Sequence, residues 1–86
     1  MESALEIGLV VVRQADGWHA RPAAEFVALV EESKHQVTVS RPNELPVRGD
    51  SVLSLLTLGL KSGETVEIRV QGENAKGVLL ALKSLF

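Results

Sequence analysis

The spacing of apolar and polar residues changes several times along the chain, and each change predicts a new element of secondary structure. A valine-rich run from about 6 to 13 is bounded by Asp16-Gly17 and predicts a first strand. Both faces of this strand are apolar, so the pattern leaves its inward phase open. From 20 to about 34, apolar residues recur at i, i+3, i+4 and i+7, which predicts an amphipathic helix.

The middle of the chain reads as a hairpin followed by a short helix. Val37 and Val39 alternate with polar neighbours, residues 41–44 form a turn signal, and alternation resumes at Leu45 and Val47. Residues 48–50 interrupt that strand. A short helix is then expected from 51 to about 58, with Asp50 or Ser51 as its N-cap.

The last part of the chain predicts one more strand and a closing helix. Apolar residues alternate at Val66, Ile68 and Val70, which predicts a strand. From Ala75 to Leu85 the apolar residues recur at helical spacing, which predicts a helix. The order is therefore βαββαβα. This order favours an α+β fold, an open-faced β-sandwich in which a four-stranded, mostly antiparallel sheet carries three helices on one face.

Composition narrows the possible roles. A chain of 86 residues is expected to form one domain over 1–86. Nine basic and eleven acidic side chains, with only three aromatic residues, argue against a nucleic-acid partner. There is no cysteine, and the apolar run 7–12 is too short to span a bilayer. We expect a cytoplasmic protein with no membrane insertion, no metal and no cofactor.

The candidate chemistry lies in the segment 17–23, where the first strand gives way to the amphipathic helix. His19 is predicted at or next to the N-cap, with Ala20, Arg21 and Pro22 in the first turn. Backbone N–H groups at a helix start lack intrahelical partners, and together with the helix dipole they favour a phosphate. Pro22 fits because an early helical position does not need its N–H. Imidazole titrates near neutrality and is a nucleophile when neutral, and the guanidinium of Arg21 offers a fork of donors to phosphate oxygens.

A plainer interpretation of the same residues is available. His19 would then be a surface residue at a helix start, Arg21 a solvated side chain and Pro22 a helix starter. The residue pattern by itself leaves the two interpretations open. His35, at the predicted end of the same helix, is expected to be a solvated surface residue.

The segment 17–23 resembles the active-site signature of HPr, the histidine-containing phosphocarrier of the bacterial phosphoenolpyruvate-dependent sugar phosphotransferase system. The resemblance extends to the length, the element order and the runs 51–53 and 57–63. It implies that His19 accepts a phosphoryl group on Nδ1 from enzyme I and donates it to enzyme IIA proteins or domains. It also implies that the Arg21 side chain and the Ala20 and Arg21 amides stabilise the phosphate. Such a protein is a phosphoryl carrier and not a stand-alone enzyme.

The resemblance also implies a docking surface around the short helix. Leu55 and Leu58 are predicted on its core side, so Val52, Leu53 and Leu56 are expected to be at least partly exposed. Together with Trp18, these three residues are expected to form the surface that contacts partners. The basic residues that often rim this surface are absent, since Ala28, Glu31 and Ser54 occupy those places. The alternative to an exposed docking surface is that the closing helix covers more of these apolar residues.

Ser51 is a second candidate site. In Gram-positive members of the family, the serine at this position is phosphorylated by a dedicated kinase. Serine is also simply a good N-cap, and Asp50 stands where many relatives have lysine.

Two alternative functions therefore remain beside the sugar carrier. One is a nitrogen-branch phosphocarrier with the same histidine chemistry. The other is a serine-phosphorylated co-regulator, served by a serine kinase or phosphorylase, that binds a transcriptional regulator or an enzyme.

Overall fold

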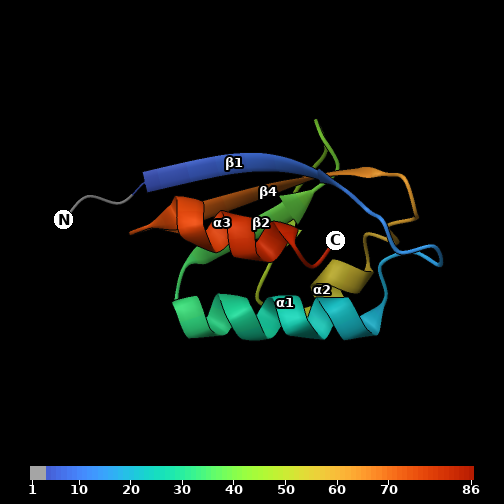
Figure 1. Ribbon diagram of the computed structural model, residues 1–86, viewed down its shortest axis with the longest axis horizontal. Helices are drawn as coiled ribbons and strands as arrows, with labels where there is room; N and C mark the ends of the chain where they lie inside the picture. The colour runs from blue at the N-terminus through green and yellow to red at the C-terminus, as the bar shows by residue number, and fades with distance from the viewer. Residues whose placement is uncertain (1–3) are drawn as a thin grey trace.

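The computed structural model describes residues 4–86 and confirms the predicted βαββαβα order (Figure 1). The elements are β1 (Ala4–Val11), α1 (Ala20–Ser33), β2 (Gln36–Ser40), β3 (Val47–Arg48), α2 (Val52–Leu56), β4 (Thr65–Gly72) and α3 (Ala75–Lys83). Within residues 4–86, no helix is long and apolar enough to cross a membrane.

All four strands pair antiparallel in the order β1-β4-β2-β3, and the three helices lie on one face of the sheet, as predicted. β1 and β4 pair over their full length, from Ala4 opposite Gly72 to Val11 opposite Thr65. β1 is therefore one edge of the sheet. The face opposite the helices is open.

The core fills the space between the sheet and the helices. Alternate residues of β2 and β4 point into it, and α1 and α3 contribute Phe26, Val30, Leu79 and Leu82. The structure also settles the phase of β1. Its odd-numbered residues from Leu5 to Val11 are exposed on the open face, and its even-numbered residues face the helices.

The predicted hairpin partner around Leu45 is wrong in extent. Only Val47 and Arg48 form β3, whereas Leu45 is 89% exposed and lies outside the sheet. Pro46 has no backbone N–H to donate to a ladder, which limits pairing to the residues after it. The short helix is likewise confined to Val52–Leu56, with Ser51 as its N-cap and Thr57 as its C-cap.

Candidate phosphoryl site at the start of the first helix

The loop between β1 and α1 is folded back so that His19 lies at the first turn of the helix. Gly17 has φ +88°, a conformation that favours glycine, and a Cβ there would lie 3.0 Å from the carbonyl oxygen of Leu60. The next residue, Trp18, donates its backbone N–H to that same oxygen at 3.0 Å. The loop is therefore fixed against the segment that precedes β4.

The first turn of α1 leaves two backbone donors free. His19 is the N-cap, with an extended backbone and no side-chain capping bond, and its carbonyl accepts from the Ala23 N–H at 3.2 Å. Pro22 has no N–H. The amides of Ala20 and Arg21 have no hydrogen-bond partner among residues 4–86. Two N–H groups and the positive end of the helix dipole thus lie next to the imidazole, an arrangement that suits an anion.

The side chains around these amides form an open site. His19 and Arg21 are both exposed, and they line a shallow depression of about 340 Å³ together with Gln14, Pro22, Glu25, Ser84 and Leu85. None of the ion pairs within residues 4–86 uses Arg21, so its guanidinium is available to an incoming oxyanion. Glu25 is the acidic residue in the lining and would oppose a second negative charge.

The structure corrects the predicted role of Trp18. Its side chain is only 5% exposed, because it stacks on Phe86 at a ring-centre distance of 4.3 Å and meets Phe26 edge-on at 5.7 Å. The indole N–H donates to the carbonyl oxygen of Leu85 at 2.8 Å. Trp18 therefore anchors the site from beneath and is not part of an exposed docking face.

The α2 region is placed close to this site. α1 and α2 pack against each other, and Figure 1 shows α2 beside the N-terminal half of α1. Leu55 is buried and Leu58 is half-buried, as predicted for the core side, whereas Leu53 is 76% and Leu56 38% exposed. Val52 is half-buried against the core.

Ser51 acts as the N-cap of α2. Its Oγ accepts a hydrogen bond from the Ser54 backbone N–H at 3.2 Å, and its side chain is half-buried. The preceding Asp50 is held by two bonds from the Arg48 guanidinium, at 2.5 and 3.0 Å, which keep the pKa of the Asp50 carboxyl below its ordinary value.

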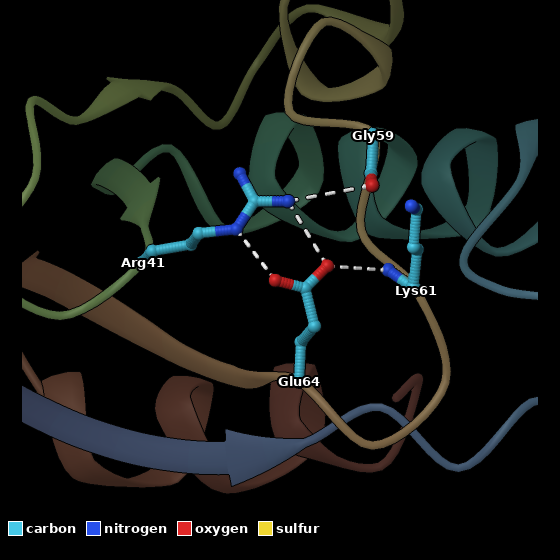
Figure 2. Close-up of polar contacts among 4 residues, drawn as sticks. All are labelled: Arg41, Gly59, Lys61 and Glu64. Atoms are coloured by element: carbon cyan, nitrogen blue, oxygen red, sulfur yellow. Dashed lines mark hydrogen bonds and ion pairs between the residues drawn. The ribbon is translucent and has the colours of Figure 1, made fainter.

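An ion pair that the sequence did not reveal holds the loop between α2 and β4, whose Leu60 carbonyl oxygen accepts the Trp18 backbone N–H (Figure 2). Arg41 donates to both carboxylate oxygens of Glu64, at 2.6 and 2.9 Å, and reaches the carbonyl oxygen of Gly59 at 3.4 Å. Glu64 also accepts the Lys61 backbone N–H at 2.7 Å. These bonds lower the pKa of Glu64 to about 2. The two partners are 23 residues apart, so no local pattern could have paired them.

His35 lies at the other end of α1 and cannot share a ligand with His19. Fourteen residues of helix separate the two ends, which corresponds to about 20 Å. The His35 ring is half-buried and not simply solvated as predicted, since Nδ1 lies 2.8 Å from the Ser33 carbonyl oxygen and Nε2 2.5 Å from that of Glu73.

Comparison with known proteins identifies the family to which the chain belongs. The family model described as "PTS HPr component phosphorylation site" matches residues 8–86. The chain is 36% identical over 76 residues to the phosphocarrier protein HPr of Streptomyces coelicolor, covering 88% of this chain and 82% of that one. The chain belongs to the HPr family of phosphocarrier proteins of the phosphotransferase system.

Other matches show the range of that family. The phosphocarrier protein NPr of Proteus mirabilis is 30% identical over 77 residues, which cover 90% of this chain and 86% of the relative. The multiphosphoryl transfer protein of Salmonella typhimurium is 32% identical over 74 residues, or 84% of this chain but only 20% of the longer protein. The crystal structure of HPr from Bacillus anthracis superposes with a TM-score of 0.84 at 26% identity, covering 95% and 96% of the two chains.

Proposed function

We propose that this chain carries a phosphoryl group on His19 between enzyme I and an enzyme IIA protein or domain in sugar uptake. The observation that carries the proposal is the pair of amides at Ala20 and Arg21, which have no partner in the described part of the chain and lie beside an exposed imidazole. The Arg21 guanidinium likewise takes part in no ion pair among residues 4–86. HPr proteins act with enzyme I and enzyme IIA, which supplies the class of donor and acceptor.

The transfer step follows from this arrangement. The Nδ1 lone pair of a neutral His19 ring forms a bond to phosphorus, and the bond from phosphorus to the donor group of enzyme I breaks, leaving its electron pair with the donor. The phosphoryl oxygens then accept from the two amides and the Arg21 guanidinium, which stabilise the added negative charge. Transfer to the acceptor reverses these roles. Because the site is open, each partner completes it by excluding water and adding its own charges.

Labelling tests the carrier function. The protein is incubated with phosphoenolpyruvate and enzyme I, and intact-mass spectrometry then looks for the gain of one phosphate. We expect a gain that is lost in acid and stable in base, absent in His19→Ala and retained in the matched control His35→Ala. A phosphate that persists in His19→Ala overturns the proposal, as does the absence of labelling with enzyme I from several bacteria.

The nitrogen branch is the second candidate, and the match to an NPr protein is the observation that favours it. Both branches use the same histidine chemistry, so the site alone does not separate them. The two branches can be separated by the relative rates at which sugar-branch and nitrogen-branch enzyme I label the same preparation of the protein. A higher specificity constant with the sugar-branch enzyme supports our proposal, and the reverse assigns the nitrogen branch.

Regulatory phosphorylation of Ser51 is a separate candidate. Its hydroxyl is engaged as the cap of α2, and Asp50 beside it adds negative charge, so the geometry supports the structural role more strongly. An ATP-dependent, acid-stable phosphate that disappears in Ser51→Ala would establish the regulatory role, with Ser54→Ala as the neighbouring control.

A further inference from the structure

The outer edge of β1 carries features that the carrier function does not use. β1 is an eight-residue edge strand that pairs only with β4 within residues 4–86. Val12, directly after β1, donates its backbone N–H to the backbone carbonyl oxygen of Glu64 at 2.9 Å, which sets the alternation of hydrogen-bonded residues along the β1–β4 pair. Even-numbered residues therefore turn their backbone groups toward β4, and the odd-numbered ones turn theirs outward.

The same odd-numbered residues form an apolar row on the open face. Leu5, Ile7, Leu9 and Val11 are 47–55% exposed, whereas their neighbours on β4 are polar. Edge strands are usually protected from pairing by a proline, a lysine or a bulge. β1 has none of these. Glu6 is its single charged residue and lies on the helix-facing side.

We propose that β1 is a homodimer interface, in which the β1 strands of two copies pair antiparallel about a two-fold axis at Gly8. In this register Ile7 lies opposite Leu9 of the second copy, and Leu5 lies opposite Val11. All outward backbone groups of the four residues then find partners, and the two sheets join into one of eight strands. The opposed side chains form cross-strand apolar pairs of the kind that stabilise sheets.

Charge complementarity supports a second copy as the occupant. In this register Glu6 of one copy lies opposite Val10 of the other. Val10 lines a shallow groove between β1 and α3 together with Arg13 and Lys83, and no ion pair within residues 4–86 uses either cation or Glu6. The carboxylate of each copy is thus brought to the two cations of the other. Leu80, 61% exposed on α3, lines the same groove and adds apolar contact.

The interface is small, so we expect a weak dimer that accumulates as the concentration rises toward about 1 mM. Sedimentation equilibrium over a concentration series measures its dissociation constant. Ile7→Lys places a charge in the row and should raise that constant at least about tenfold, because the substitution acts twice per dimer. Leu45→Lys, at another exposed leucine, should leave it unchanged. Glu6→Gln should raise the dissociation constant by a smaller factor, and added salt should abolish the difference between this variant and the wild type.

A cross-link tests the register, since the natural chain has no cysteine. Mixed Ile7→Cys and Leu9→Cys proteins should form a disulfide-linked heterodimer faster than either protein forms a homodimer. Far-UV circular dichroism confirms that each variant is folded. A monomer at every concentration overturns the proposal. So does a dimer that Ile7→Lys does not weaken, or one that forms by exchanging β1 onto β4 of the other copy and gives no Ile7–Leu9 cross-link.

Discussion

Trp18 is the residue through which the core supports the site, and its replacement gives a sharp test of that role. The indole stacks on Phe86, and Phe26 meets both rings edge-to-face from the side. These three are the only Trp, Tyr or Phe side chains in the chain. The indole N–H is also bonded to the Leu85 carbonyl oxygen. Substitution should therefore lower the free energy of unfolding, and it should affect phosphoryl transfer only as far as folding is lost.

The magnitude follows from what each substitution removes. Trp18→Ala deletes a buried aromatic ring and should cost about 3–5 kcal/mol. Trp18→Phe keeps an aromatic ring and loses the hydrogen bond and part of the volume. The Leu85 oxygen still accepts from Gln14 Nε2 at 3.0 Å, so it is not left unpaired. The loss for Trp18→Phe should be about 1–2 kcal/mol, or a fall in Tm of roughly 4–16 °C for a domain of this size.

Urea unfolding followed by far-UV circular dichroism measures both values, because this signal does not depend on the indole. Leu45→Ala, at a position 89% exposed, is the matched control and should change stability by less than about 0.5 kcal/mol. Trp18→Phe should still be labelled on His19 at the wild-type rate. If Trp18→Ala lowers the free energy of unfolding by less than about 1 kcal/mol, the core role of Trp18 is refuted. A fully stable Trp18→Phe protein that no longer engages enzyme I would also refute it.

Three further predictions concern the charges and the docking surface. Arg21→Ala removes a charge-assisted donor worth about 1.5–3 kcal/mol and should slow labelling by roughly 10- to 100-fold without loss of fold; an unchanged rate would contradict its phosphate role. Leu53→Asp should lower the specificity constant of transfer at least about tenfold, whereas Leu45→Asp should not; equal effects would reject α2 as the docking site. The folded-state pKa of Glu64 lies below its unfolded value, so its ion pair with Arg41 stabilises the protein above pH ~4.3 and is lost as the pH falls toward 2. The stability of Glu64→Gln should therefore converge on the wild type over that window, and parallel pH profiles would refute the assignment.

The sequence predicted the fold and the position of His19 at the start of α1 because both depend on local patterns. The spacing of apolar residues predicted the helices and strands. The helix start predicted after Gly17 placed His19 beside backbone amides that lack intrahelical partners. The phase of β1 stayed open because both faces of that strand are apolar, and only the position of the helices decides which one is buried.

The errors have long-range causes. Trp18 precedes an exposed histidine, yet its ring is buried because Phe86, at the far end of the chain, provides a stacking surface. The Arg41–Glu64 pair joins two loops that the sheet topology brings together. Leu45 continues the alternating pattern, but Pro46 has no backbone N–H to give to a strand pair, and Leu45 lies outside the sheet. Each feature depends on tertiary contacts that sequence spacing does not encode.

The most direct test of the central claim is nuclear magnetic resonance of the phosphorylated protein with ¹⁵N-labelled histidine and amides. We expect phosphorus to couple to the Nδ1 nitrogen of His19, and the largest backbone amide shifts to occur at Ala20 and Arg21. The His35 ring should keep its unphosphorylated signals. Phosphorus on another residue, or on His19 with the Ala20 and Arg21 amides unmoved, would contradict the account of a phosphohistidine held by the start of α1.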